Sequence, residues 1–277
     1  MCFLELSQVQ KGGNMSITSV MKSTFFILFL LSSSFTFADD SSKGLEIAIQ
    51  ADKTSEGFVD SQSSMEMQLT NRKGNVVTRK MKSKRLEVKG DGDKSLIIFE
   101  SPRDVKGVAI LSFSHKTSAD DQWLYLPALK RVKRIASKNK SGPFLGSEYT
   151  FEDLSSQEVE KFSYLFLRDE DLDGQPNHVI ERIPLDPYSG YTKQIVWIDK
   201  KNFLVQKIEY YDRKSFHLKT GTFSGYKKYL DKIWQASRME IVNHQNKKKT
   251  VLIFKDIAYK TGLSDKDFSQ NSLKRSR

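Results

Sequence analysis

The chain has 277 residues, of which 29% are charged, and a formal net charge of +11 at pH 7. A basic chain favours anionic partners such as lipid headgroups, acidic protein surfaces or nucleic acid, although the charge could also serve solubility alone. The single cysteine, Cys2, lies close to the N-terminus. The rest of the chain therefore contains neither a disulfide nor a thiolate ligand for a metal.

Residues 21–38 have the three parts of a secretory signal peptide. A lysine follows Met21, an uncharged apolar run of 14 residues extends from Thr24 to Phe37, and small residues stand at Thr36 and Ala38. These two positions are −3 and −1 relative to a cleavage site. The run is too short to cross roughly 30 Å of hydrocarbon as a helix, which argues against an uncleaved membrane anchor.

We therefore expect residues 1–38 to be removed and residues 39–277 to be exported as a single domain. Residues 1–20 carry no targeting pattern of their own and are best explained by a start site assigned upstream of Met21. The residue after the expected cleavage site is Asp39 and not a cysteine, so no lipid anchor is expected. Export also makes nucleic acid the least expected partner.

The exported part begins with one predicted helix, from about Ser42 to Val59, with Leu45, Ala48 and Ile49 on one face. After it, apolar and polar residues alternate in short segments between Gly, Asp, Asn or Pro clusters, which is typical of strands. The expected strands are 65–69, 77–88, 96–99, 108–113, 123–126, 130–135, 162–167, 179–183, 194–198, 204–211, 219–226, 234–242 and 251–259.

About a dozen strands with short connections predict a mainly β, antiparallel meander. A single sheet of this size must curl or split to bury its apolar face, and the alternation favours curling around one interior. A barrel of that width is too wide for its own side chains to fill. The N-terminal helix and a short helical turn around residues 152–159 are available as lids.

The sequence lacks a recognisable catalytic site. The four histidines, His115, His178, His217 and His244, are scattered. None of them lies beside a nucleophile elbow or in a His-Glu-x-x-His pair. A hydrolase acting on lipids or glycans is therefore the least favoured function, and we expect no enzymatic activity.

The acidic segment 169–176 alternates aspartates before a glycine, like the opening of a calcium loop. The twelfth position of such a loop, counted from Asp169, is Ile180, and the required glutamate, Glu181, comes one residue late. Strand patterns flank the segment where a calcium loop of this type needs helices. The sequence favours an acidic hairpin turn, and neither a metal nor a cofactor is expected.

The segment WLYLPALKRVKR (123–134) places an apolar run directly before a basic cluster. Pro127 interrupts strand pairing, and glycines at 142 and 146 turn the following loop. One interpretation is an edge strand whose charges prevent aggregation. The other is a surface for lipid headgroups or for an acidic partner protein, formed by Lys130, Arg131, Lys133 and Arg134.

This segment, with FLGSEYTFEDL (144–154), KGVAILSF (106–113), YTKQIVWIDKKNFLVQKIEYYD (191–212) and KTVLIFKDIAY (249–259), resembles the outer-membrane lipoprotein-sorting proteins, the broad LolA-like family of exported lipid-binding proteins. The resemblance covers nearly all of the exported chain. It implies an incomplete, half-open β-barrel closed by helices, with a hydrophobic interior that shelters acyl chains in the periplasm. The chain is longer than the simplest carriers and resembles more closely an uncharacterised branch of the family, some members of which serve lipid exporters of the inner membrane.

The function that follows from the resemblance is a non-enzymatic, monomeric periplasmic carrier, which moves a lipid or an acylated lipoprotein from an inner-membrane transporter toward the outer membrane. The alternative is an accessory binding module that docks on such an exporter or on anionic lipid and carries no cargo. Acyl chains retained by the purified protein would distinguish the two, because only a carrier should hold them.

Strand alternation also predicts which side chains line the interior. One face of each strand should point inward, although a register error of one residue exchanges the two faces. The residues expected to bind the acyl chain are Met67, Ile98, Leu111, Trp123, Trp197 and Phe254.

Overall fold

The computed structural model of the protein describes residues 34–274. Most of the expected signal peptide lies outside these residues, so its removal stays a prediction. The description below concerns the unit that begins at Asp40. None of the helices in the described part is long and apolar enough to cross a membrane.

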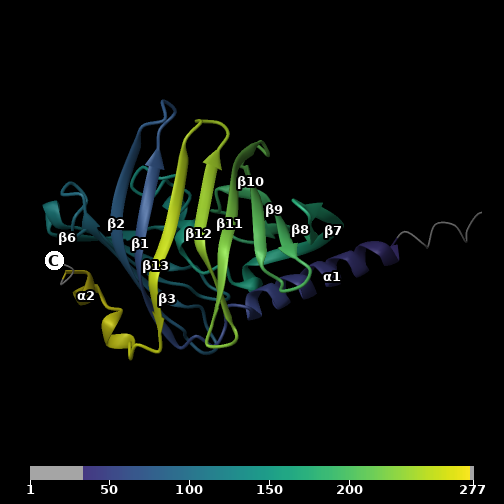
Figure 1. Cartoon of the computed structure of the whole chain (residues 1–277), viewed down its shortest axis with the longest axis horizontal. Coiled ribbons are helices and arrows are strands. Elements are labelled where there is room, and N and C mark those ends of the chain that lie inside the picture. Colours follow the sequence, from purple (N-terminus) through teal and green to yellow (C-terminus); the bar gives the residue numbers. More distant parts are fainter. Residues whose placement is uncertain (1–33, 275–277) are drawn as a thin grey trace, which may run out of the picture. The chain divides into compact units, whose positions relative to one another are not determined.

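The thirteen strands expected from the sequence are all present in the described part, within one antiparallel sheet (Figure 1). Alternation locates them well because each strand turns at least part of one face toward a covered interior. The strands are β1 (Asp60–Thr70), β2 (Val76–Leu86), β3 (Lys94–Ser101), β4 (Ala109–Phe113), β5 (Asp121–Leu126), β6 (Arg131–Ile135), β7 (Phe162–Leu172), β8 (Gln175–Pro184), β9 (Tyr191–Asp199), β10 (Val205–Asp212), β11 (His217–Tyr229), β12 (Ile233–Asn243) and β13 (Lys249–Tyr259).

The helical elements are few and short apart from the first helix. Helix α1 (Ser34–Lys53) ends six residues before the predicted end at Val59. The chain finishes with α2 (Gln270–Lys274). Single 3₁₀ turns are found at η1 (Pro127–Leu129), η2 (Ser137–Asn139), η3 (Glu152–Leu154), η4 (Val159–Lys161) and η5 (Asp265–Asp267).

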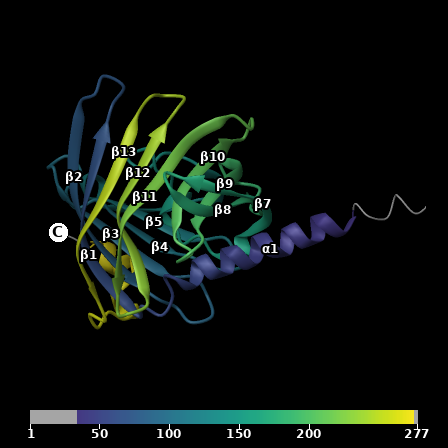
Figure 2. The same ribbon diagram turned by 45° about the vertical axis from the view of Figure 1, so that its right-hand side comes forward.

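The strands are ordered β6-β5-β4-β3-β2-β1-β13-β12-β11-β10-β9-β8-β7 across the sheet. The pairing of β1 with β13 joins two meanders, and β6 and β7 form the two edges. Because these edges do not pair with each other, the curled sheet is a half-open barrel, as expected, with α1 passing below β7–β9 in the view of Figure 2.

The acidic segment between β7 and β8 is a tight hairpin. Asp173 and Gly174 occupy the turn with φ angles of 52° and 81°, as a two-residue turn between twisted strands requires. The Asp171 carboxylate accepts a hydrogen bond from the backbone N–H of Gly174 at 2.7 Å. Among the described residues, no group of three or more His, Cys, Asp or Glu side chains is arranged to hold a metal ion.

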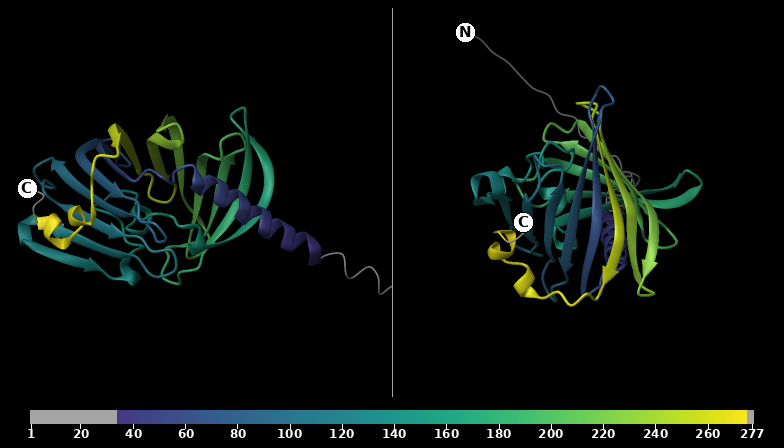
Figure 3. Two further views of the ribbon diagram at one scale, coloured as in Figure 1. Left: turned by 90° about the horizontal axis from the view of Figure 1, so that it is seen from below. Right: turned by 60° about the vertical axis from the view of Figure 1, so that its left-hand side comes forward.

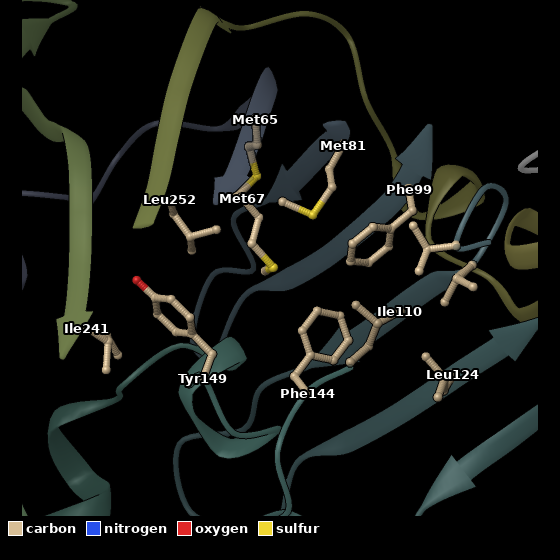
Figure 4. Close-up of a cluster of buried hydrophobic side chains, with 12 residues drawn as sticks. Met65, Met67, Met81, Phe99, Ile110, Leu124, Phe144, Tyr149, Ile241 and Leu252 are labelled. Atoms are coloured by element: carbon tan, nitrogen blue, oxygen red, sulfur yellow. The ribbon is translucent and has the colours of Figure 1, made fainter. Parts of the chain in front are cut away.

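The loop between β6 and β7 fills one half of the barrel interior. Phe144, which is fully buried, and Tyr149 face the methionines of the sheet, Met65, Met67 and Met81 (Figure 4). The rings of Phe99 and Phe144 lie 5.8 Å apart. The long connection between the two edge strands therefore acts as a plug, and it contains the helical turn at η3 that was expected as a lid.

The C-terminal segment covers the opposite, outer face of strands β4–β6 (Figure 3). Phe268 and Leu273 are buried there against Leu96, Leu111 and Tyr125. This end of the sheet is therefore apolar on both faces.

Candidate functional site

A cavity of about 650 Å³ occupies the half of the interior that the plug leaves open. Its apolar wall comes from the inward faces of five consecutive strands, β8–β12, and from α1. The wall side chains include Ala48, Ala51, Ile180, Val196, Ile198, Ile208, Phe223, Ala236, Met239 and Ile241. An apolar space of this size, bounded by a curled sheet and one helix, can hold a flexible hydrocarbon chain.

Helix α1 lies against the sheet because small residues allow a close approach. A Cβ atom at Gly44 would stand 2.7 Å from the backbone nitrogen of Phe166 on β7. The Lys43 ammonium lies 3.4 Å from the centre of the Phe166 ring, a cation–π contact. Ala48 and Ala51 then turn toward the cavity from the same helix, so α1 forms one wall.

A buried polar network holds the plug against the sheet beside the cavity. The Lys219 ammonium, with a residue exposure of 1%, donates to the Asp153 carboxylate at 2.6 Å and to the Glu148 carbonyl at 2.9 Å. Tyr191 donates its hydroxyl to Asp153 at 2.9 Å. Burial raises the pKa of Tyr191 well above its usual value, so this hydroxyl stays protonated and can donate. The network ties the plug to β9 and β11.

The open end of the cavity is lined by charged side chains. Exposed residues among the lining, including Glu56, Lys89 and Gln157, mark this end. We call it the mouth. Asp52 at the end of α1 and Glu158 beside η4 border it as well.

Two carboxyl groups at the mouth have raised pKa values. Burial, reinforced by the charge of Glu56, raises the pKa of Asp52 to about 6. Burial, reinforced by Asp93 and Asp52, raises the pKa of Glu158 to about 7. These shifts indicate a mouth in which negative charges lie close together and are partly removed from water.

None of the six residues predicted to bind the acyl chain lines this cavity. Met67 and Phe254 are on the inner face, but they pack in the cluster that the plug fills. Ile98, Leu111 and Trp123 are on the outer face, in the cluster covered by the C-terminal segment.

Trp197 also faces outward, since its neighbours Val196 and Ile198 line the cavity. Its ring nitrogen donates to the Glu170 carboxylate at 3.0 Å, and the Lys207 ammonium lies 3.7 Å from the ring centre. Had the inward face of β9 been assigned one residue earlier or later, the prediction would have named the cavity-lining residues Val196 or Ile198. The pattern could not decide, because all six residues from Gln194 to Asp199 are buried and alternation is lost. Ligand binding by the six predicted residues stays a prediction.

The predicted basic cluster lies on edge strand β6 and not at the cavity mouth. Arg131, Lys133 and Arg134 are exposed, and Arg134 pairs with Asp121. Lys130 precedes the strand in a left-handed conformation, with a φ angle of 50°. The cluster therefore charges an open sheet edge, and it does not surround an apolar opening.

The residues that sequence reasoning missed are the cavity wall of β8–β12 and the charged mouth. The burial of Lys219 could not be predicted from the sequence, because a lysine within a polar strand segment is normally expected to be exposed. The mouth is formed by residues from α1, the β2–β3 turn and the η4 region. These segments are far apart in the sequence, so no local sequence pattern predicts that they lie together.

The chain is similar to several known proteins over most of its length. A family model described only as "Uncharacterized protein" matches residues 91–275. A crystal structure of a domain described as an outer membrane lipoprotein-sorting protein from Vibrio parahaemolyticus is 55% identical, with a TM-score of 0.83 over 85% of this chain and 100% of that one. No curated protein matches significantly.

Two further structures have the same fold. A DUF1329 family protein from Desulfovibrio piger is 30% identical, with a TM-score of 0.80 over 84% of this chain and 99% of that one. A LolA superfamily protein from Nitrosomonas europaea is 20% identical, with a TM-score of 0.68 over 83% of this chain and 98% of that one. The latter likeness concerns the fold alone.

Proposed function

The chain belongs to the family of outer membrane lipoprotein-sorting proteins with the LolA fold, and from this we propose that it is a non-enzymatic carrier. It holds the acyl chains of a lipid or lipoprotein in the cavity beside α1 and carries them across the periplasm toward the outer membrane. The observation that supports this most is the apolar cavity of about 650 Å³ that the plug leaves open.

The energetics of transfer fit such a cavity. Each buried methylene contributes about 0.8 kcal/mol, so ten methylenes contribute roughly 8 kcal/mol in a membrane and a similar amount in a dry protein interior. Exchange between the two is then nearly balanced. A carrier needs this balance, because it must both extract the chain and release it.

Filling the cavity should abolish acyl binding. Ala236 on β12 is buried and lines the cavity, so Ala236→Trp replaces the space that a hydrocarbon chain would occupy. We expect the affinity for a fluorescent acyl probe to fall at least about tenfold. Ala51→Phe narrows the same space from α1 and should act in the same direction.

The matched control is Ala258→Trp on β13, where the alanine is exposed and does not line the cavity. Its affinity for the probe should equal that of the parent. Thermal melts identify any variant that fails to fold. Unchanged binding in both folded cavity variants would overturn the proposal.

The basic edge of β6 supports a second part of the proposal, docking on an inner-membrane transporter or on anionic lipid. Arg131 and Lys133 are exposed, and contacts of exposed charges weaken as salt rises. We expect Arg131→Glu with Lys133→Glu to slow acyl transfer between anionic vesicles several-fold at low salt and to change little at high salt.

The control for docking is Lys247→Glu with Lys248→Glu in the β12–β13 turn, which makes the same change in net charge elsewhere on the surface. Equal transfer rates for the edge variant, the turn variant and the parent at low salt would mean that the edge charges only prevent strand pairing. Static acyl binding should be unchanged in both variants.

A further inference from the structure

The charge at the cavity is opposite in sign to the charge of the chain. The residues that line the cavity include seven carboxylates and four cations, although the whole chain carries a net charge of +11. In a basic protein a random distribution of charge would favour cations, and not carboxylates, around this apolar opening. The excess points to the chemistry of whatever enters there.

Three of the four cations among the cavity-lining residues already have partners, and the fourth, Lys89, is exposed. Arg85 contacts the Asp93 carboxylate at 2.9 Å, and Lys116 contacts Glu160 at 3.2 Å. The guanidinium of Arg182 donates to the Gln194 side chain at 2.8 Å. Two of these four positive charges are therefore neutralised by carboxylates, and a third is held by a neutral side chain.

Several carboxylates at the mouth, in contrast, lack a partner within the described part of the chain. The side chains of Asp52, Glu56 and Glu158 have no hydrogen-bond or salt-bridge partner among residues 34–274. Glu158 is only 9% exposed, and a carboxylate that is partly removed from water without a partner is destabilised in its charged form. A nearby cation stabilises the charged form of such a group.

Helix α1 adds to the negative potential. The helix ends at Lys53, one residue after Asp52, so its C-terminal end lies at the mouth. The aligned peptide dipoles give a helix C-terminus a partial negative charge that favours cations, although the carbonyls of Ala51 and Asp52 already accept hydrogen bonds from Thr54 and Ser55. The side chain of Lys53 is exposed and does not line the cavity.

We propose that the mouth selects acyl cargo whose polar head carries an ammonium group, and that Asp52 and Glu158 are the residues that recognise it. The inference rests on the proposed carrier function, because it concerns the head of the molecule whose hydrocarbon chain fills the cavity. An ammonium group offers three N–H donors, which two or three carboxylates can accept together. A head with only negative charge is repelled.

The selectivity should depend on pH. Asp52 and Glu158 face further negative groups, Asp93, Glu56 and Glu160, and the positive groups Lys116 and Lys161. With pKa values of about 6 and about 7, both carboxyls are ionised at pH 8 and largely protonated at pH 5.5. The ammonium preference is then present at pH 8 and weak at pH 5.5.

The test compares dodecylamine, dodecanol and dodecanoate, which share a hydrocarbon chain and differ in head charge, as competitors of an uncharged fluorescent acyl probe. At pH 8 we expect the parent to bind dodecylamine about tenfold more tightly than dodecanol, with dodecanoate weakest. In Asp52→Asn with Glu158→Gln, amine and alcohol should bind within about threefold of each other. The same competition with lysophosphatidylethanolamine, which carries an ammonium group, and lysophosphatidylglycerol, which does not, extends the comparison to lipid headgroups. The former should bind more tightly.

The control variant is Glu100→Gln with Asp256→Asn, which makes the same charge change at two exposed positions outside the cavity. It should keep the full amine preference, and the parent should lose most of that preference at pH 5.5. If dodecanol binds and dodecylamine binds no more tightly, the headgroup inference is wrong and the carrier function stands. If none of the three competes, the carrier function itself is wrong.

Discussion

Replacement of Lys219 by methionine is expected to lower the free energy of unfolding by about 3–5 kcal/mol. The ammonium is fully enclosed and bonded to Asp153 and to the Glu148 carbonyl. Methionine has a similar length but no charge, so the variant leaves the Asp153 carboxylate buried, with only the Tyr191 hydroxyl and the backbone N–H of Thr150 as donors. Urea unfolding of parent and variant measures the difference.

Two further variants separate an uncompensated charge from a loss of packing. Adding Asp153→Asn to Lys219→Met removes the unpaired charge and should recover part of the lost stability. Lys193→Met removes a lysine whose partner, Glu181, lies on the neighbouring strand near the surface, and should cost less than about 1 kcal/mol. A loss below about 1 kcal/mol for Lys219→Met would contradict a fixed, buried ion pair.

The network also explains why the plug could not be predicted. The loop between β6 and β7 is held by isolated contacts, such as Phe144 among the methionines and Asp153 with Lys219. Neither Phe144 nor Asp153 belongs to a periodic pattern. Asp153 and Lys219 lie 66 residues apart along the chain. The strands could be predicted because alternation is local, whereas the plug depends on contacts between distant segments.

The faces of the strands were harder to assign than the strands themselves. In β4 four of five residues are buried, since the plug covers one face and the C-terminal segment the other. Leu111 and Ile110 are equally apolar and point to opposite sides. Only the position of the C-terminal segment decides between them, and that segment has no alternation that would reveal its place.

Phe268→Ala is therefore expected to lower the free energy of unfolding by about 3–5 kcal/mol while leaving acyl binding unchanged. The Phe268 ring is 3% exposed and packs in the outer cluster with Leu96 and Leu111. Its removal leaves a gap under the C-terminal segment, and none of these side chains lines the cavity. Phe216→Ala, at a position that is 65% exposed, should change stability by less than about 0.5 kcal/mol.

The measurement pairs chemical unfolding with titration of the fluorescent acyl probe at a temperature where every variant is folded. Phe268→Ala should lose stability and keep its affinity, and Ala236→Trp should lose its affinity. This contrast tests whether the inner cavity or the outer cluster binds the hydrocarbon chain. If folded Phe268→Ala lost its affinity and Ala236→Trp kept it, the outer cluster would be the binding site, as the sequence predicted for Ile98, Leu111 and Trp123. In that case the ligand would have to displace the C-terminal segment, because this segment covers the outer cluster.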